Sequence, residues 1–541
     1  MSSYNCKGGF FMKTKHMKMT MALLLSASLV TGLCISSAAA DHGSAGTAEQ
    51  TNVSENTGNR PDGTDEGVPG DFPGEPPEGG KMGMPPEKPD GNGRPGGAPD
   101  GTSPDGNGGP GGAPDGTPPD GMGGHGGPGG APGGRSADIE YIGAIEISSN
   151  DTQDGQTYIS NSSDENALLI STSEEVTITN PTVTKTGDSD GGDNCNFYGL
   201  NAGILVKDGS TTTITGGTIT TDADGANGVF SYGGNGGQNG ADGDGTTVII
   251  RDTAVTTTGD GSGGIMTTGG GTTYAYDLDI HTSGRSSAAI RTDRGGGTVV
   301  VDGGTYATNG LGSPAIYSTA DITVSNAELT SNLSEGVCIE GLNSITLNDC
   351  DLTADNTECN GNATFQDSIM IYQSMSGDAD SGTSHFTMAG GSLTSKNGHV
   401  FHVTNTNAVI TLENVEIVNE DEDNVLISVC DDGWSGGSNT AELDASAQNL
   451  SGAVLVGSNS SLDLNLTNGS SLEGYVDGKI TNAKGETVST EAGNVTVTLD
   501  ESSTWSLTGD SYVTEFNGNA ENVIANGYTL YVNGSALTGT N

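Results

Sequence analysis

Three arginines lie close together in a chain that is otherwise strongly acidic: Arg285, Arg291 and Arg294. A guanidinium group can hold a carboxylate by two parallel hydrogen bonds, and an Arg beside a uronate sugar can take the proton whose loss begins β-elimination. Arg291 and Arg294 are therefore candidates for lyase chemistry, and all three are candidates for binding an acidic sugar. The simpler interpretation, which we favour, is that they pair with some of the 69 acidic residues.

The motif Asp431-Asp432-Gly433-Trp434 combines two carboxylates with one of the two Trp residues. An aromatic ring beside polar acceptors is suited to contact with a sugar. Asp431, Asp432 and Trp434 are therefore candidate ligand-binding residues. An acidic loop whose Trp folds onto the protein body explains the same motif equally well.

Several Gly-rich turns carry carboxylates at short spacing, as calcium-binding loops do. Ca²⁺ takes about six to eight oxygen ligands, and no turn here completes the EF-hand pattern with its distal Glu. We therefore expect mostly solvated loops, with weak Ca²⁺ binding as the one cofactor prediction. The candidate metal ligands are Asp188, Asp190, Asp193, Asp222, Asp224, Asp242 and Asp244.

These residues must be positioned by a chain with few large apolar side chains. Only 31% of the residues are apolar and 5% are aromatic, whereas Gly accounts for 90 of the 541 residues. Gly and Asn tolerate positive φ angles and Thr suits a pleated strand, so this composition favours short strands joined by tight turns. A thin core built from many similar layers can be made from so few aliphatic residues.

Short apolar segments recur along the chain and can be aligned with one another. Each is followed by a strand of alternating apolar and polar residues, by a turn rich in Asn, Asp and Gly, and by a third short strand. The alternation places Ile322 and Val324 inward in one unit, and Ile345 and Leu347 inward in the next. The aligned segments are Ala289–Thr292, Ala315–Ser318, Val337–Glu340, Met370–Gln373, Val400–Val403 and Leu426–Val429.

Three short strands per unit are typical of a right-handed parallel β-helix. A β-sandwich would need longer strands and hairpin turns between antiparallel neighbours. We therefore predict an all-β fold, with a parallel β-helix over residues 136–497. Residues 498–541 hold one of the two Trp residues and several Tyr and would cover the last coil, although an aromatic platform for stacking on sugars is an alternative.

The N-terminal part of the chain has two segments of unusual composition. The first forty residues contain a basic start, an apolar run and Ala38-Ala39-Ala40, which together are typical of a signal peptide. We predict a signal peptide at 1–40 with cleavage near Ala40, and hence a secreted or cell-surface protein that does not stay inserted in the membrane. Residues 41–135 are rich in Gly, Pro and Asp and too poor in aliphatic residues to form a core, so we expect a disordered linker.

The formal net charge of −51 excludes some partners and favours others. Such a chain repels nucleic acid and anionic membranes, which leaves polysaccharides or surface glycans as the expected partners of a monomeric protein. An odd number of Cys residues remains after the predicted cleavage, without any Cys-x-x-Cys pair. We therefore expect apolar core fillers and not a disulfide framework or a zinc site. These residues are Cys195, Cys338, Cys350, Cys359 and Cys430.

Three stretches together resemble secreted β-helix proteins of gut clostridia: 313–322, Ser334-Glu335-Gly336 and 369–375. The ending from Trp505 to Gly534 is similar too. Proteins of this kind are described as pectin-lyase-fold, adhesin-like or carbohydrate-binding-like. The resemblance therefore implies a fold and a location more than a chemistry.

Pectin-type hydrolases of this fold share a paired Asp, a Gly-His-Gly and a downstream Arg-x-Lys. Here Asp431-Asp432 follows Asn397-Gly398-His399 in the reverse order, and Arg-x-Lys is missing from the sequence. We therefore expect a non-catalytic adhesin-like protein that binds glycans or polymers of host or plant surfaces. A calcium-dependent uronate lyase and a structural stalk without a ligand are the alternatives.

Overall fold

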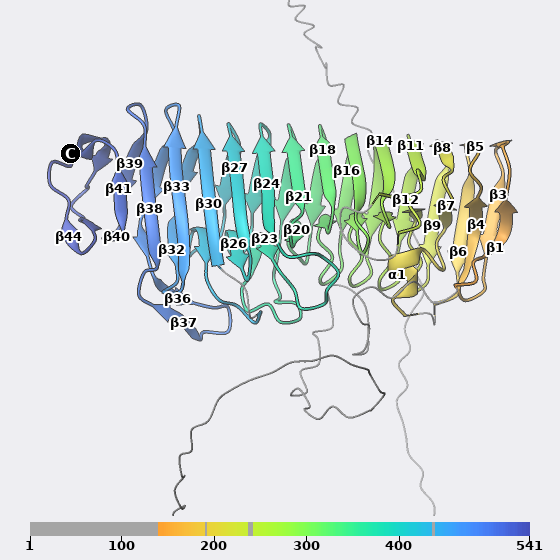
Figure 1. Ribbon diagram of the computed structural model, residues 1–541, viewed down its shortest axis with the longest axis horizontal. Helices are drawn as coiled ribbons and strands as arrows, with labels where there is room; N and C mark the ends of the chain where they lie inside the picture. The colour runs from red at the N-terminus through yellow and green to blue at the C-terminus, as the bar shows by residue number, and fades with distance from the viewer. Residues whose placement is uncertain (1–138, 190–191, 236–241, 435–438) are drawn as a thin grey trace, which may run out of the picture. The chain divides into compact units, whose positions relative to one another are not determined.

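The computed structural model describes residues 139–189, 192–235, 242–434 and 439–541. Most of this part of the chain is β-strand, stacked coil upon coil in parallel sheets (Figure 1). The predicted right-handed parallel β-helix is therefore confirmed. The predicted signal peptide at 1–40 and linker at 41–135 lie outside the described residues. Within the described part, no helix is long and apolar enough to cross a membrane.

One strand of each coil belongs to a 13-stranded parallel sheet, which we call sheet A. Neighbouring strands pair in parallel, for example Ile290 with Ile316 and Ile316 with Val337, and the register shifts once, between Val425 and Ile427 where β29 pairs with β32. Parallel stacking places these residues above one another at intervals of about 4.8 Å. The strands of sheet A are β1 (Ile142–Ile147), β4 (Glu165–Ser171), β7 (Ile204–Lys207), β10 (Val229–Tyr232), β13 (Ile265–Thr268), β15 (Ile290–Thr292), β17 (Ile316–Ser318), β20 (Val337–Glu340), β23 (Asp367–Tyr372), β26 (His399–Thr404), β29 (Val425–Val429), β32 (Ala453–Val456) and β35 (Val476–Asp477).

The remaining strands of most coils belong to a 22-stranded sheet, sheet B. Two of them, β14 (Gly271–Thr282) and β16 (Gly297–Thr308), run through both halves of the sheet without a break. The others are β2 (Asp151–Asp154), β3 (Thr157–Ser160), β5 (Glu175–Thr179), β6 (Thr182–Thr186), β8 (Thr211–Thr215), β9 (Thr218–Asp222), β11 (Thr247–Arg251), β12 (Ala254–Thr257), β18 (Asp321–Ser325), β19 (Glu328–Ser331), β21 (Ser344–Asn348), β22 (Asp351–Ala354), β24 (Thr383–Ala389), β25 (Ser392–Ser395), β27 (Asn407–Glu413), β28 (Glu416–Asn419), β30 (Asn439–Ser446), β33 (Ser460–Thr467), β38 (Asn494–Leu499) and β41 (Glu515–Asn517).

Smaller elements complete the described part of the chain. Sheet C continues the third side of the coils toward the C-terminus, and parallel pairing there extends beyond residue 497. Its strands are β31 (Asn449–Ser451), β34 (Ser471–Gly474), β39 (Thr504–Leu507) and β42 (Val523–Ile524). The remaining elements are the helices α1 (Asn194–Tyr198) and η1 (Ala520–Asn522), the antiparallel pair β36 (Lys479–Thr481) and β37 (Thr487–Thr490), and the small sheet of β40 (Ser511–Val513), β43 (Leu530–Val532) and β44 (Ser535–Ala536).

Inward-facing aliphatic residues form one core that continues through the coils, as the alternation predicts. Ile322 pairs with Ile345 and Val324 with Leu347 in strands β18 and β21, and all four are at most 1% exposed. Complete burial of a Leu or Ile side chain contributes about 1.5–3 kcal/mol. Repeated thin layers therefore stabilise the fold although the chain is poor in apolar residues.

A sharp bend between the second and third sides of these coils holds at least one residue per coil in the left-handed region. Gly adopts positive φ at little cost, and Asn and Asp tolerate it better than other residues do. Ala447, with φ of 51°, is the exception in this set. The stacked bends explain part of the abundance of Gly, Asn and Asp. These residues are Asn180, Gly216, Asp252, Asp277, Gly303, Asn326, Asp349, Gly390, Asn414, Ala447 and Asn468.

Two of the six aligned apolar segments take a register that differs from the alignment. Ile316 pairs with Val337, and Val337 pairs with Ile369, so the third segment moves by one residue and the fourth by two. The cause is the outer face of sheet A, where Cys338 and Met370 are buried as completely as the inward residues. When both faces of a strand are apolar, alternation no longer fixes its register.

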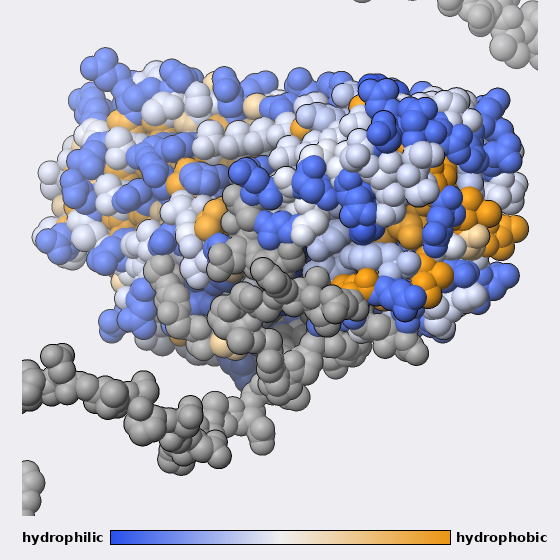
Figure 2. Space-filling view, turned by 45° about the vertical axis from the view of Figure 1, so that its right-hand side comes forward, coloured by the Kyte–Doolittle hydropathy of each residue, from blue (hydrophilic) through white to orange (hydrophobic). Residues whose placement is uncertain are grey.

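The two ends of the β-helix are covered differently. In the first coil, the Tyr158 hydroxyl donates to Gln153 Oε1 at 2.9 Å, and Gln153 Nε2 donates to Asp151 Oδ2 at 2.7 Å, which forms a polar end layer. Toward the other end Trp505 is completely buried between Leu472 and Val523 of the neighbouring coils, and its indole N–H donates to the Gly474 carbonyl at 3.0 Å, so this predicted cap residue lies inside the stack of coils. Figure 2 shows apolar surface toward its right-hand end, where the exposed apolar residues of the first coil are Ile142, Ile145 and Ile159.

Candidate functional site

Long insertions lie beside the outer face of sheet A. They occupy 355–366 and 373–382, on either side of β23, and residues from 430 onward, after β29. Figure 1 shows the larger loops along the lower edge of the β-helix. The insertions cover outward side chains, so that Tyr317, Met370 and Trp434 belong to one buried cluster. This covered face contains most of the buried ionisable residues of the described part of the chain.

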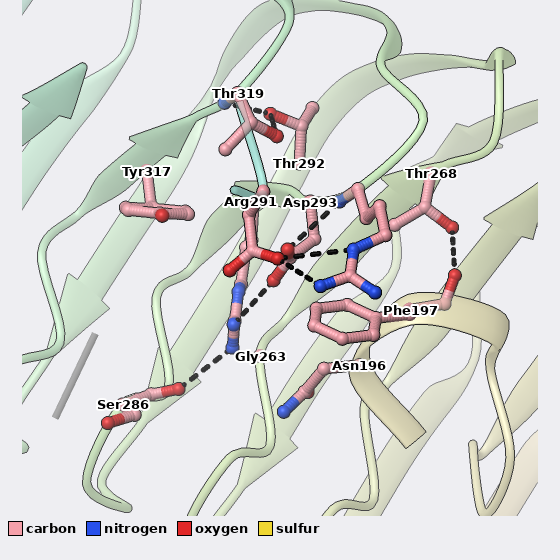
Figure 3. Close-up of polar contacts among 12 residues, drawn as sticks. Asn196, Phe197, Gly263, Thr268, Ser286, Arg291, Thr292, Asp293, Tyr317 and Thr319 are labelled. Carbon is pink, nitrogen blue, oxygen red and sulfur yellow. Dashed lines mark hydrogen bonds and ion pairs between the residues drawn. The ribbon is translucent and has the colours of Figure 1, made fainter. Parts of the chain in front are cut away.

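Arg291 lies beneath this cover and not at the surface. Its guanidinium donates to Asp293 Oδ2 at 2.7 Å and to the Ser286 carbonyl at 3.0 Å, and its side chain is 3% exposed (Figure 3). The Asp293 side chain is 1% exposed. Burial raises the pKa of Asp293 to about 7, although Arg291 lowers it. Arg291 and Asp293 are therefore placed as a buried structural ion pair.

Arg294 and Arg285 hold the insertions against the β-helix. Arg294 forms an ion pair with Asp378 at 2.6 Å, and its guanidinium lies 4.1 Å from the ring centre of Phe197 in α1. Arg285 donates to Asn360 Oδ1 at 3.3 Å. The structure therefore places the three predicted arginines in one region but directs each guanidinium toward protein groups.

Three aspartates on successive coils form a ladder of hydrogen bonds. Asp188 Oδ1 accepts the N–H of Asp224 at 3.0 Å, and Asp224 Oδ1 accepts the N–H of Asp260 at 2.9 Å. Asp260 Oδ1 then accepts the N–H of Arg285 at 2.8 Å. Each carboxylate thus binds the backbone of the following coil, which gives these acidic turns a structural role.

The other predicted metal ligands do not form a single group. Asp222 accepts a hydrogen bond from Thr258 at 2.5 Å, and Asp244 binds the Thr246 N–H at 2.9 Å. Asp242 is exposed, Asp193 precedes α1, and Asp190 lies outside the described residues. Within the described ranges, no three His, Cys, Asp or Glu side chains are placed to hold a metal ion.

The motif Asp431–Trp434 divides between the surface and the covered face. Trp434 is 8% exposed and packs on Tyr372 with 5.1 Å between ring centres, so this Trp is folded onto the protein body. Asp431 is exposed, whereas the Asp432 side chain is fully buried and accepts the Thr364 N–H at 2.7 Å. Asp432 therefore joins the insertion at 355–366 to the segment that follows β29.

Asp432 also faces a serine and two histidines that sequence analysis did not connect. Ser428 on β29 pairs with His402 on β26, and His402 Nδ1 lies 2.8 Å from Ser428 Oγ. His402 Nε2, on the other side of the same ring, lies 3.5 Å from Asp432 Oδ2. His399 Nδ1 lies 2.7 Å from Ser428 Oγ. Ser428, His402 and Asp432 thus form a serine–histidine–aspartate arrangement on the covered face.

Phe365, from the insertion at 355–366, closes this arrangement from outside. Its ring centre lies 4.6 Å from that of His402 and 5.3 Å from that of His399. Burial, assisted by His402, lowers the pKa of His399 to about 3, although the residue as a whole stays partly exposed. Burial alone would raise the pKa of Asp432, but hydrogen bonds from His402 and Thr364 outweigh it and lower the pKa. His399 is therefore neutral and Asp432 ionised near pH 7.

Two buried carboxyl groups stand beside this arrangement. Asp367 pairs with His399 in the neighbouring coil, and Gly336 donates its N–H to Ser368, which places Glu335 beside Asp367. Burial raises the pKa of both carboxyl groups, and Glu335 and Asp432 raise that of Asp367 further. The pKa values of Glu335 and Asp367 are therefore both raised, beside a carboxyl group, Asp432, whose pKa is lowered.

A second candidate site lies on the exposed outer face of sheet B. Tyr274 and Tyr276 on β14 flank the inward Ala275, so both rings lie on the outer face and are partly exposed. Arg251 on β11 pairs with Tyr276, and its guanidinium carbon lies 3.7 Å from that ring centre. We call Arg251, Tyr274 and Tyr276 the tyrosine platform. The spacing Tyr-Ala-Tyr in an alternating strand was the sequence signal for it.

A column of threonines continues from the tyrosine platform along sheet B. Pairing in register connects Tyr274 to Val300 and then to four Thr residues in successive coils, all on the outer face. Side chains in such a column repeat at intervals of about 4.8 Å. The four, which we call the threonine column, are Thr323, Thr346, Thr387 and Thr411.

The described Cys residues are free, and four of the five are buried. This agrees with the prediction of core fillers. The comparisons with protein-family models, curated proteins and solved structures find no match to this chain. The functional argument therefore rests on the geometry of the covered face and of the tyrosine platform.

Proposed function

We propose that the chain is an adhesin-like β-helix protein outside the cell that binds neutral glycans on the outer face of sheet B without acting on them chemically. The observation that carries this proposal is the tyrosine platform, in which two tyrosine rings on one strand face solvent beside a stacked Arg. Aromatic rings present a flat apolar surface with a polar edge, which suits the faces and hydroxyl groups of a sugar. The threonine column offers hydroxyl groups along the direction in which a polymer would continue.

Charge favours neutral glycans over uronates. The chain carries a formal net charge of −51, and Glu328 and Asp351 stack in register on the other half of sheet B, where both are exposed. Like charges along this surface repel acidic polymers, most strongly at low salt. Binding to uronate-rich polymers should therefore be weaker than binding to neutral ones.

The test is retention of the protein on insoluble polysaccharides. Wild type and Tyr274→Ala/Tyr276→Ala are incubated with cellulose, xylan, chitin, starch and a uronate-rich pectin, and the unbound fraction is measured. We expect wild type to bind at least one neutral polymer, and the double variant to bind it at least about tenfold more weakly, which corresponds to about 1.4 kcal/mol.

The aromatic cap supplies a matched control with the same number of tyrosines removed. Tyr512 on β40 and Tyr531 on β43 stack at 5.2 Å with an interplanar angle of 7°, and Tyr512 is 43% exposed. Tyr512→Ala/Tyr531→Ala should retain binding. Loss of retention in this variant alone would move the site to the cap, and no retention of wild type on any polymer would contradict glycan binding and favour a stalk.

The lyase alternative has weaker geometric support. It requires Arg291 or Arg294 to reach a substrate carboxylate, yet Arg291 is 3% exposed and paired with Asp293. Weak Ca²⁺ binding at the acidic turns remains a proposal as well. Ultraviolet absorbance from unsaturated products, measured with and without Ca²⁺ on the pectin sample, tests both ideas in the same experiment.

A further inference from the structure

We propose that Ser428, His402 and Asp432 form a hydrolytic centre for small acyl esters on the covered face of sheet A. This proposal is independent of glycan binding, since it concerns the covered face of sheet A and not the exposed outer face of sheet B, and it involves different residues. It rests on the mutual geometry of the three side chains, which matches the roles of nucleophile, base and orienting carboxylate. Such constellations are recognised by geometry and not by their order in the chain.

The hydrogen bonds assign a protonation state to each ring. Asp432 Oδ2 and His402 Nε2 lie 3.5 Å apart, within ion-pair distance; both are buried, and neither atom forms a hydrogen bond. An ionised Asp432 therefore places the His402 proton on Nε2, which leaves Nδ1 as an acceptor. Ser428 Oγ, 2.8 Å away, then donates its hydroxyl proton to Nδ1 of His402. This is the arrangement that activates a serine.

His399 acts on the other side of the same oxygen. Its Nδ1 lies 2.7 Å from Ser428 Oγ, and because the Ser428 proton is directed to His402, His399 must donate its own N–H. This donor fixes the orientation of Oγ, so that its hydroxyl proton stays directed at His402. The Ser428 hydroxyl group thus donates to the His402 ring and accepts from the His399 ring. Two such contacts on one hydroxyl are more than the stability of a loop requires.

The reaction follows from these positions. Ser428 Oγ forms a bond to the carbonyl carbon of the ester while His402 Nδ1 takes the hydroxyl proton. The bond between that carbon and the alcohol oxygen breaks, and the alcohol leaves with the proton from His402. Water then attacks the acyl-serine with His402 again as base, which releases the acid and restores Ser428. Asp432 is a positioning residue that orients the ring and stabilises its cationic form.

The cover determines which esters can react. Phe365 is 2% exposed and stacks on His402, while Thr364 in the same insertion donates its N–H to Asp432. Access therefore requires Phe365 to swing aside, and because Phe365, His402 and Ser428 are all buried, a small acyl group such as acetyl needs the least displacement. Displacement of Phe365 leaves the other three residues in place, because none of them belongs to the insertion. Ser428 lies on β29, His402 lies on β26, and Asp432 lies in the segment that follows β29.

The experiment measures hydrolysis of p-nitrophenyl acetate together with covalent labelling of Ser428. Wild type and Phe365→Ala are treated with the ester and, separately, with a small fluorophosphonate, and the modified residue is located by peptide mass mapping. We expect an adduct on Ser428 and a higher kcat/KM for Phe365→Ala than for wild type. Ser428→Ala should lower kcat/KM at least about a thousandfold.

Ser368→Ala supplies the matched control, because Ser368 on β23 is equally buried and contributes nothing to the serine–histidine–aspartate arrangement. It should retain the activity of wild type. Asp432→Asn should lower kcat and change the acid limb of the pH profile, which a purely structural role would not do. The proposal is overturned if neither wild type nor Phe365→Ala acquires an adduct on Ser428, or if Ser428→Ala hydrolyses the ester as fast as wild type. The labelling result needs no Ser428 variant, so a folding defect there leaves the test decisive.

Discussion

Replacement of Arg291 by Met is expected to destabilise the protein while leaving glycan binding intact. Arg291 and Asp293 have side chains 3% and 1% exposed, and their charged groups lie 2.7 Å apart. Removal of one partner of a buried pair costs about 3–5 kcal/mol, because the remaining group must either keep a buried charge or take up a proton. We expect Arg291→Met to lower the free energy of unfolding by this amount at pH 7.

The cost should grow with pH above about 7. In wild type, burial raises the pKa of Asp293 to about 7, so that the carboxyl group is mostly ionised at higher pH with Arg291 beside it. Without Arg291 the folded state must keep Asp293 protonated, whereas the unfolded state releases that proton. The unfolded variant then binds fewer protons than the folded one, so its stability falls by up to about 1.4 kcal/mol per pH unit. Below pH 7 the free energy of unfolding falls with pH by the same slope in wild type and variant. The destabilisation caused by Arg291→Met is therefore constant there.

Urea titrations at pH 6, 7, 8 and 9 measure the difference, and Arg251→Met is the matched control. Arg251 is partly exposed and stacks on Tyr276, so its loss should cost only about 0.5–1 kcal/mol. The two Arg→Met variants should behave oppositely, because Arg251→Met weakens glycan retention and Arg291→Met does not. An unchanged unfolding midpoint for Arg291→Met, or a cost that falls between pH 7 and 9, would refute the assignment of a buried ion pair.

Three further outcomes follow from the coil geometry. Ala447→Gly should raise the free energy of unfolding by about 0.5–1 kcal/mol in a urea titration, because Ala447 has a φ of 51°; a decrease would contradict the strain argument. Leu347→Ala should cost about 2–5 kcal/mol, whereas Thr346→Ala on the outer face should stay within about 0.5 kcal/mol, and similar costs would contradict the inward assignment. Trp505→Ala should cost about 3–5 kcal/mol and expose the C-terminal coils to limited proteolysis, and unchanged proteolysis would argue against its role in holding these coils together.

The repeating core was predictable from the sequence because alternation is clear wherever one face of a strand meets solvent. Strands β18 and β21 show this, since Ile322, Val324, Ile345 and Leu347 all lie inward as expected. Sheet A was harder to predict. Its outer face is buried under insertions, so alternation carried no register information there, and the alignment at Val337 and Met370 was off by one and two residues.

The candidate sites were only partly predictable, for two different reasons. Asp432 and His399 were noted, but their link through Ser428 depends on the pairing of β26 with β29, which the sequence does not show. The predicted arginines were singled out for their charge, and the structure shows that charge directed at Asp293 and Asp378. Tyr274 and Tyr276 could have been found from their alternation alone. Their aromatic character was instead attributed to strand formation.

The threonine column has a consequence for how tightly a polymer can be held. The four threonines present nearly the same hydroxyl at the same height in successive coils, so a chain lying along them can shift by one coil and meet an equivalent set of contacts. Equivalent alignments multiply the number of bound states. A segment that contacts one threonine at a time has four such alignments, which make its binding more favourable by RT ln 4, or about 0.8 kcal/mol. A bound polymer would therefore slide between alignments before dissociating, with the tyrosine platform as the one fixed point along its path.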